Sequence, residues 1–262
     1  MKKRIDLLLV EQGFYDTRHK AQVNIMAGNV YADGVLTDKA GALVDEKCKI
    51  TIKQELVPYV GRGGLKLEKA LEVFNIKLDS KICMDVGAST GGFTDCMLQN
   101  GAKKVYAIDV GYNQLAYKLR IDQRVVCMER TNFRYIENEK VPDKIEFATV
   151  DVSFISLTKI LPKLKELMAQ DYEIVTLIKP QFESKRQEVN KGIIKDEKIH
   201  KRVIKEIVDF AGEIGIVADK ITFSPITGQK GNIEYLAHFV DKGISLTTKD
   251  IDKAVEESHA NF

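Results

Sequence analysis

Four charged residues of this sequence occupy positions that are otherwise apolar. Lys66 interrupts a largely apolar helical pattern, and Asp151 and Lys179 each follow an apolar strand pattern. Glu234 lies within the last strand pattern, at residues 233–240. A lysine can act as a base when burial or nearby positive charge favours its neutral form, and carboxylates can hold such lysines in place. The set therefore indicates either a base with its supporting groups or two structural ion pairs.

A glycine-rich turn offers a second kind of site. Residues 85–93 read Asp-Val-Gly-Ala-Ser-Thr-Gly-Gly-Phe, between a strand pattern and a helical pattern. Glycines permit a tight turn and a close approach to a ligand, and the helix that follows offers free N–H groups. Asp109 ends the next predicted strand, where a carboxylate can accept hydrogen bonds from both hydroxyls of a ribose. Together they predict a nucleoside-containing ligand; the alternative is a purely structural turn.

Ser89 decides which nucleoside ligand fits this turn. A dinucleotide-binding turn reads G-x-G-x-x-G, and its second glycine leaves bare backbone for the pyrophosphate. Ser89 stands at that second position. A ligand with an adenosine and no phosphates tolerates a side chain there, so S-adenosylmethionine fits better than NAD.

The elements that must position these residues follow from residue 65 onward. Strand patterns lie at 81–86, 104–109, 124–128, 146–150, 173–178 and 220–223, and helical patterns at 65–74, 92–99, 156–169 and 196–214. Their alternation predicts a doubly wound α/β sheet with parallel strands. The strand at 233–240 has no helix before it, so it must run antiparallel to 220–223. Ligands bind at the carboxyl ends of parallel strands, which would bring Asp151, Lys179 and Glu234 together.

The first 54 residues follow a different pattern. Helical patterns at 4–12 and 17–27 precede a hairpin at Asp33-Gly34 and a strand at 49–53. We therefore expect a small α+β domain at 1–54, a linker rich in glycine at 55–64, and a large domain at 65–262. Arg4, Arg18 and Lys20 could pair with RNA phosphates, and the alternative is that they serve solubility.

Composition limits the class of protein. A chain of 262 residues with 44% hydrophobic and 30% charged residues is typical of a globular protein. The net charge of +2 does not itself indicate nucleic acid, but eight Lys or Arg stand against four Asp or Glu between Lys179 and Arg202. The four cysteines show neither disulfide nor metal-site spacing, so no metal is expected. The apolar run at 7–10 is too short for a signal peptide or a membrane span, which favours the cytoplasm.

The chain resembles the TlyA family of ribosomal RNA 2′-O-methyltransferases, which are often labelled hemolysins and have a catalytic domain of the FtsJ type. The resemblance covers essentially the whole chain, and its motifs are the segments at 62–67, 130–134, 151–157, 177–183, 224–228 and 231–236. The segment Val57–Val60 lacks the tryptophan of some members, and Ile193 stands where a second glycine is expected. The first unit resembles the RNA-binding module named after a small-subunit ribosomal protein.

The resemblance implies a seven-stranded Rossmann-like methyltransferase sheet whose last strand is antiparallel. It implies S-adenosylmethionine as the cofactor and ribosomal RNA or ribosomal subunits as the partner, with cytidine as the target. It implies a catalytic tetrad of Lys66, Asp151, Lys179 and Glu234, with Lys179 as the base. The implied cofactor pocket consists of Gly87, Ala88, Ser89, Gly91, Gly92, Phe93, Asp109, Asn132 and Asp151. The expected RNA contacts are Arg4, Arg18, Lys20 and Arg62.

Two other classes of function are compatible with parts of the sequence. One is a membrane-active hemolysin, which the family label suggests but no apolar segment supports. The other is an RNA-binding or ribosome-assembly factor that does not catalyse methylation. The intact glycine-rich turn and the tetrad favour the enzyme over both. The sequence leaves the oligomeric state open, and a monomer is compatible with it.

Overall fold

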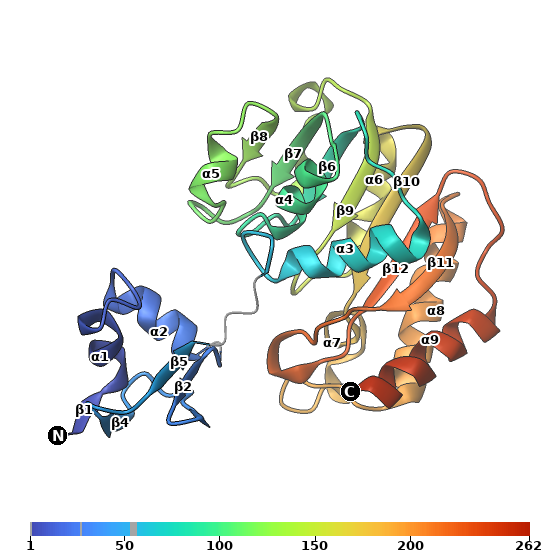
Figure 1. The fold of residues 1–262 in the computed structure, drawn as a ribbon. Helices are drawn as coiled ribbons and strands as arrows, with labels where there is room; N and C mark the ends of the chain where they lie inside the picture. Colours follow the sequence, from blue (N-terminus) through green and yellow to red (C-terminus); the bar gives the residue numbers. More distant parts are fainter. Residues whose placement is uncertain (1, 27, 53–56) are drawn as a thin grey trace. The chain divides into compact units, whose positions relative to one another are not determined.

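The computed structural model describes residues 2–26, 28–52 and 57–262 (Figure 1). It contains two compact units, Met1–Val57 and Pro58–Phe262. The domain end expected at residue 54 and the start of the linker at 55 lie outside the described residues. So do the last residue of the helix expected at 17–27 and the last residue of the strand expected at 49–53.

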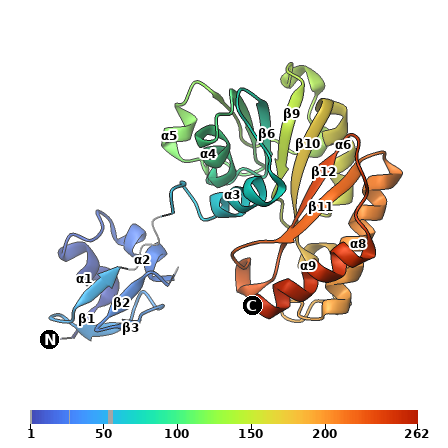
Figure 2. The same ribbon diagram turned by 45° about the vertical axis from the view of Figure 1, so that its right-hand side comes forward.

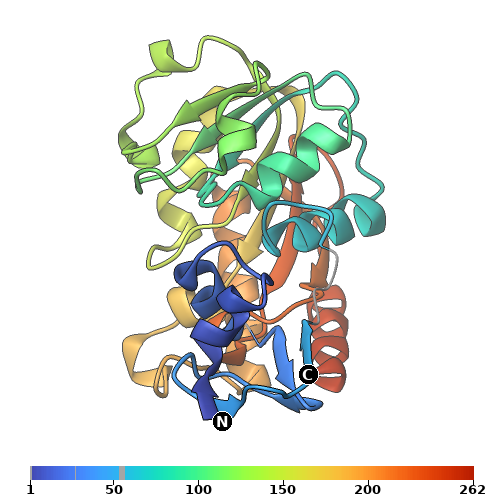
Figure 3. The same cartoon turned by 60° about the vertical axis from the view of Figure 1, so that its left-hand side comes forward.

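The first unit is a small α+β structure. Its helices are α1 (Ile5–Glu11) and α2 (Arg18–Met26), which lie beside the strands in Figure 3. One sheet has the order β3-β2-β5, and a second pairs β1 with β4. The strands are β1 (Lys2–Arg4), β2 (Val30–Ala32), β3 (Val35–Leu36), β4 (Leu43–Asp45) and β5 (Ile50–Ile52). Asp33 and Gly34 both have positive φ, as the predicted type I′ hairpin turn requires. The pair β1 and β4 was not predicted.

The second unit is built on a seven-stranded sheet of order β11-β12-β10-β9-β6-β7-β8 (Figures 1 and 2). The strands are β6 (Ile82–Val86), β7 (Lys104–Ile108), β8 (Val125–Met128), β9 (Ile145–Val150), β10 (Met168–Ile178), β11 (Val217–Phe223) and β12 (Tyr235–Val240). Neighbours among β6 to β10 are parallel, and β12 is antiparallel to both β10 and β11. The predicted doubly wound sheet with an antiparallel last strand is confirmed.

Apolar clusters cover both faces of this sheet, as alternating strand residues require. One cluster packs strand residues such as Met84 and Ile174 against α6, α8 and α9. The other packs Cys83 and Val175 against α3, α4 and the segment around α5. The helices are α3 (Gly63–Phe74), α4 (Gly92–Gln99), α5 (Tyr117–Arg120), α6 (Leu161–Leu167), α7 (Pro180–Glu183), α8 (Glu197–Glu213) and α9 (Thr248–Asn261).

Several details of the second unit differ from the expectations. The helix expected at 156–169 is too long, because α6 ends at Leu167 and Met168 already pairs with Ile145 of β9. The last strand begins at Tyr235, so Glu234 precedes the strand and does not lie within it. The C-terminal helix α9 was not predicted. None of these differences moves the charged residues away from the expected edge of the sheet.

Candidate active site

The ends of three neighbouring strands bring the charged residues together. Val86 of β6 pairs with Val150 of β9, which in turn pairs with Thr176 of β10. Asp151 and Lys179 directly follow β9 and β10 at this edge. Glu234 is there because the next residue, the first of β12, pairs with the last residue of β10. Because these strands end in register, residues that are far apart in the sequence lie together in one site.

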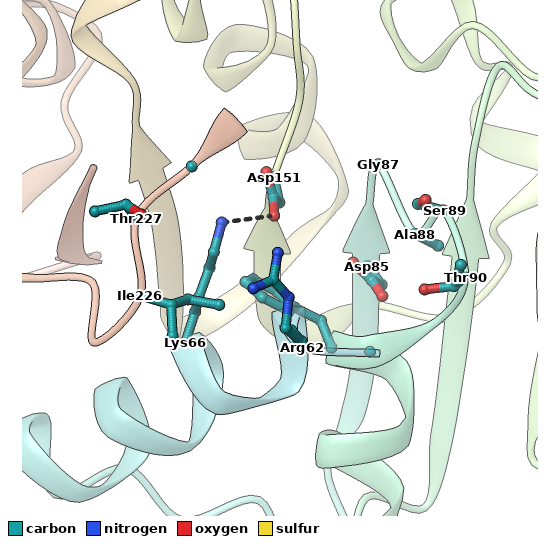
Figure 4. Close-up of a pocket in the computed structure, with 14 residues that line it drawn as sticks. Arg62, Lys66, Asp85, Gly87, Ala88, Ser89, Thr90, Asp151, Ile226 and Thr227 are labelled. Carbon is teal, nitrogen blue, oxygen red and sulfur yellow. Dashed lines mark ion pairs between the residues drawn. The ribbon is translucent and has the colours of Figure 1, made fainter. Parts of the chain in front are cut away.

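The four side chains form a continuous chain of ion pairs. The Nζ of Lys179 lies 2.5 Å from Asp151 Oδ1, and the Nζ of Lys66 lies 3.8 Å from Asp151 Oδ2. Lys66 also donates to Glu234 Oε2 at 2.7 Å. Figure 4 shows Lys66 extending from α3 toward Asp151. Lys66, Lys179 and Glu234 are each less than a tenth exposed, and every charge in the chain has an opposite partner, as buried charges require.

Three further residues support this chain and were not predicted as site residues. Lys179 donates to Ser153 Oγ at 3.3 Å, and Gln181 Nε2 donates to Glu234 Oε1 at 3.4 Å. Gly228 packs directly against Glu234, because a Cβ there would lie 2.1 Å from Oε1. A glycine at 228 is therefore required for the position of the Glu234 carboxylate.

The glycine-rich turn lies at the same edge, and at two of its glycines a positive φ coincides with a lack of space for a Cβ. Gly87 has a φ of 90°, and a Cβ there would lie 2.3 Å from the Asp151 carbonyl oxygen. Gly91 has a φ of 95°, and its Cβ would lie 2.3 Å from Leu119 Cδ1. Gly87 thus brings the turn against the tetrad, and Gly91 lets the α5 segment pack onto the turn.

Asp109 is connected to this turn by hydrogen bonds. Its Oδ2 accepts from the Ser89 N–H at 2.8 Å, and its Oδ1 accepts from the Gly111 N–H at 2.6 Å. The carboxylate is therefore fixed at the carboxyl end of β7, next to the turn. Each oxygen keeps a further lone pair, so Asp109 can still accept hydrogen bonds from a ligand.

Two cavities meet along this edge. The first, of about 390 Å³, is lined by Arg62, Gly63, Lys66, Asp85, Gly87, Ala88, Ser89, Thr90, Gly92, Phe93, Asp151, Ile226, Thr227 and Gly228. The second, of about 510 Å³, includes in its lining Gly87, Ser89, Asp109, Asn132, Phe133, Asp151 and Phe154. Because both contain Gly87, Ser89 and Asp151, they adjoin at the turn. All the expected cofactor residues line one or both cavities except Gly91, which instead packs against Leu119.

Asn132 and Arg62 occupy exposed positions at the rims of these cavities. The Asn132 side chain caps a short helical turn, where its Oδ1 accepts from the Arg134 N–H at 3.3 Å and from Arg134 Nε at 3.2 Å. Arg62 precedes α3 and is exposed beside the tetrad. Both are free to meet a ligand from the solvent side.

Asp85 is a buried carboxyl group that was not predicted as a site residue. Its Oδ2 accepts from the N–H and the hydroxyl of Thr94, and its Oδ1 accepts from Thr149 Oγ1 at 3.2 Å. Complete burial, assisted by the nearby charge of Asp151, raises the pKa of Asp85 to about 6, against the hydrogen bonds from the two threonines. Asp85 thereby fixes the first turn of α4, which directly follows the glycine-rich turn.

Glu129 holds the loop after Asp109 in place and was also not predicted. It accepts hydrogen bonds from the backbone N–H groups of three loop residues, Asn113, Gln114 and Leu115, at 2.8 to 3.2 Å. Arg120 donates to it at 2.7 Å. Burial opposes its ionisation, but Arg120 and the three N–H groups outweigh burial and lower the pKa of Glu129 to about 2. The loop is thus fixed against Gly91. A Cβ on that residue would lie only 2.8 Å from Leu115 Cδ1.

The basic residues of the first unit have acidic partners there. Arg4 and Arg18 both donate to Asp6, which is fully buried and also accepts from Gln22. The Arg4 guanidinium in particular holds the pKa of Asp6 well below its usual range. Lys20 pairs with Asp16 at 2.7 Å. The side chains of Arg4 and Arg18 remain 43% and 50% exposed, so they keep donors that face the solvent.

The part of the chain that the structure describes contains no cluster of three or more His, Cys, Asp or Glu that could hold a metal ion. None of its helices combines the length and the apolar character that crossing a membrane requires.

Comparison with known proteins shows which family this chain belongs to. Residues 59–240 match the family model described as FtsJ-like methyltransferase. The chain is 49% identical to Hemolysin A of Brachyspira hyodysenteriae, over 90% of this chain and 99% of the relative. It is 37% identical to the 16S/23S rRNA (cytidine-2′-O)-methyltransferase TlyA of Mycobacterium tuberculosis, over 98% and 97%.

Solved structures agree with this placement. One from Streptococcus thermophilus, described as a candidate hemolysin, superposes with a TM-score of 0.80 at 45% identity, over 99% of this chain and 96% of that chain. A methyltransferase from Listeria monocytogenes shares the fold, at a TM-score of 0.52 and 16% identity, over 70% of this chain and all of that chain. The chain belongs to the FtsJ-like methyltransferase family, in the group that contains TlyA and Hemolysin A. It is therefore an S-adenosylmethionine-dependent methyltransferase, as the sequence indicated.

Proposed function

We propose that this protein methylates the 2′-hydroxyl of a ribose in ribosomal RNA, at a cytidine. The observation that carries the proposal is the buried Lys179–Asp151–Lys66–Glu234 chain of ion pairs, which adjoins a cavity suited to a nucleoside. The names of its relatives support the same substrate, since TlyA of Mycobacterium tuberculosis is named as an rRNA (cytidine-2′-O)-methyltransferase. With ribosomal RNA as its substrate, the protein would act in the cytoplasm.

The residues around the turn fit S-adenosylmethionine. Asp109 would accept hydrogen bonds from its ribose hydroxyls, and the glycine-rich turn would lie along the adenosine and the amino-acid part. Gly87 lines both cavities, and it must be a glycine because a Cβ there would collide with the Asp151 carbonyl oxygen. When bound, S-adenosylmethionine supplies an electrophilic methyl group on a positively charged sulfur. Asp151 lines both cavities, so its carboxylate would be available to balance that charge.

The tetrad would remove the proton of the ribose hydroxyl. Lys179 accepts that proton on Nζ, which requires its neutral form. The ammonium of Lys66 shares the Asp151 carboxylate with Lys179, so the two lysines compete for one partner. Glu234 holds Lys66 at 2.7 Å and keeps it in this position. Lys66, Asp151 and Glu234 thus position Lys179. The ends of β9 and β10 fix where Asp151 and Lys179 lie relative to the cavities.

The Lys179 variants test this assignment. A positioned base contributes roughly 10²–10⁴-fold to a rate, so Lys179→Ala should lower single-turnover methylation of ribosomal RNA by about that factor. Affinities for RNA and cofactor should change little. Lys179→Arg should not restore the rate, because an arginine stays protonated. Recovery in the arginine variant would instead assign Lys179 the role of a positive clamp, and near-normal turnover in the alanine variant would remove it from the mechanism.

The first unit serves RNA binding in this proposal. Arg4, Arg18 and Lys20 would contact phosphates, which position an RNA without reading its sequence. The half-exposed guanidinium groups of Arg4 and Arg18 support this role, because Asp6 fixes each of them while leaving donors toward the solvent. Arg62 would contact the RNA at the rim of the tetrad cavity.

A further inference from the structure

A set of basic side chains that follow Lys179 or precede Glu234 in the sequence has no part in the chemistry above. Lys185, Arg186, Lys191, Lys195, Lys198 and Lys230 are all exposed, and we call them the basic rim. Across the residues that the structure describes, none of the six forms an ion pair with a carboxylate. Lys201 and Arg202, which follow in the sequence, are paired with carboxylates of α8, α9 and the preceding loop. Apart from Lys230, the basic rim is thus the unneutralised part of the positive cluster at 179–202.

Two tight turns hold the central pair of the basic rim. Lys191 has a φ of 50° and is enclosed by Asn190 and Ile193, whose backbones exchange hydrogen bonds at 3.1 and 2.9 Å. Lys230 has a φ of 60°, and its Nζ donates to the Lys191 carbonyl oxygen at 3.2 Å. A left-handed backbone costs energy for a residue other than glycine and persists only where its surroundings fix it. The two lysines are therefore presented from rigid turns.

Asn232 connects both turns to the tetrad. Its Nδ2 donates to the Gly192 carbonyl at 2.8 Å, and its Oδ1 accepts from the Ile194 N–H at 3.2 Å. Its carbonyl accepts from the N–H of Gly228, the residue that packs against Glu234. Lys230 precedes Glu234 by four residues, so their Cα atoms are separated by roughly 14 Å at most. The positions of Lys191 and Lys230 are therefore tied to that of the tetrad.

We propose that the basic rim, with Lys191 and Lys230 at its centre, binds the phosphodiester backbone of the RNA strand whose ribose lies at the tetrad. The proposal rests on the proposed function. A strand advances about 3.4 Å per nucleotide along a duplex, so a reach of roughly 14 Å covers phosphates within a few nucleotides of the target. Lysines at that distance neutralise phosphates as point charges and position the strand without reading bases. RNA is favoured over an anionic membrane because the rim adjoins a site for a nucleotide.

Lys191→Gln is the sharpest variant, because Lys191 contributes only backbone groups to the contacts above. We expect the affinity of the full chain for ribosomal RNA to fall about 3- to 10-fold at low salt. The slope of log K against log salt concentration should decrease in magnitude by roughly 0.7–0.9, as for one lost phosphate contact. Lys191→Arg should retain both, since the charge is kept. The matched control is Lys103→Gln, an exposed lysine before β7 at the opposite edge of the sheet, which should change neither.

The outcomes separate this inference from the proposed function. The salt slope could stay unchanged in Lys191→Gln and in the Lys191→Gln/Lys230→Gln double variant while the wild-type protein methylates RNA. That result would overturn RNA binding by the basic rim and leave the proposed function intact. A Lys191-dependent slope in a protein that does not methylate ribose would support the rim and contradict the proposed function. Binding to phosphatidylserine vesicles that depends on Lys191, with RNA binding that does not, would overturn the inference in favour of a membrane.

Discussion

Asp85 is a buried carboxyl group of the active-site region whose protonation makes stability depend on pH. Burial raises its pKa from 3.8 in an unfolded chain to about 6 in the folded protein. The folded state therefore holds this proton more tightly. Its contribution to stability is fully present below about pH 4 and is lost as the pH rises through 6. A shift of about two pKa units corresponds to about 3 kcal/mol in the free energy of unfolding.

Asp85→Asn should remove this pH dependence. An amide can accept from Thr94 and donate to Thr149, and it carries no charge to bury. We expect the variant to gain stability relative to the wild type between pH 4 and pH 8, by up to about 3 kcal/mol. Chemical denaturation at fixed ionic strength measures the difference, with the exposed Glu213→Gln as the control. A stability difference that stays constant over this pH range would contradict the account of Asp85.

The chemistry of single residues explains which parts of the site were predictable from the sequence. Lys66, Asp151, Lys179 and Glu234 could be predicted, because charges within or next to apolar elements are rare and strand ends share an edge. Glu129 could not, because its partners are mostly backbone N–H groups of a loop, which any sequence offers. Its position directly before the family motif at 130–134 was the only signal in the sequence.

At the scale of elements, the proposed cofactor pocket depends on two loops, the glycine-rich turn and the segment 109–116. The segment 109–116 connects β7 to α5, and its backbone is held by Glu129 at the end of β8. The same segment packs against Gly91 and donates from the Ala116 N–H to the Thr90 carbonyl of the glycine-rich turn. Movement of this loop would therefore displace both Asp109 and the turn.

Glu129→Gln should weaken cofactor binding and leave the chemical step nearly intact. The amide cannot accept from three N–H groups and Arg120 in the same way, so we expect the Kd for S-adenosylmethionine to rise about tenfold or more. The kcat at saturating cofactor should stay within about threefold, because the tetrad is untouched. Asp122→Asn is the matched control, since Asp122 binds Arg124 and its N–H away from both cavities. An unchanged Kd, or a loss confined to kcat, would refute the role of Glu129.

Elements with clear periodicity were predicted, and those that depend on tertiary contacts were not. The strands from β6 to β12 contain apolar runs that can be recognised in the sequence without knowledge of their tertiary contacts. Helix α9 has only Ile251 and Val255 as large apolar residues among its buried positions, so its sequence resembles a solvated segment. The first residues of β10 include the polar pair Gln170 and Asp171, and only the pairing of Met168 with β9 shows that the strand begins there.

At the scale of the whole molecule, the two units carry separate parts of the proposed function. The segment that begins the second unit is attached to it locally. The Val60 N–H donates to Asp95 at 2.8 Å, and Gln99 donates to the Pro58 carbonyl at 3.0 Å. A chain that starts at Pro58 therefore keeps the contacts that hold α4 beneath the cofactor cavity.

Removal of residues 1–57 should abolish methylation of ribosomal RNA and preserve cofactor binding. The second unit contains all the residues of both cavities, whereas Arg4, Arg18 and Lys20 are lost. Isothermal calorimetry with S-adenosylhomocysteine and a methyl-transfer assay on ribosomal subunits measure the two properties. Normal methylation by the truncated chain would exclude RNA recruitment by the first unit. Loss of cofactor binding would show that the second unit depends on the first.

The central claim is that the tetrad directs a methyl group to a ribose 2′-oxygen of ribosomal RNA. The most direct measurement is mass-spectrometric mapping of ribosomal RNA after incubation of intact subunits with the purified full chain and S-adenosylmethionine. Our account predicts new methyl groups on the ribose of one or a few cytidines, which are absent when Asp151→Ala replaces the wild type. Methylation on a base, or ribose methylation that persists in Asp151→Ala, would contradict it.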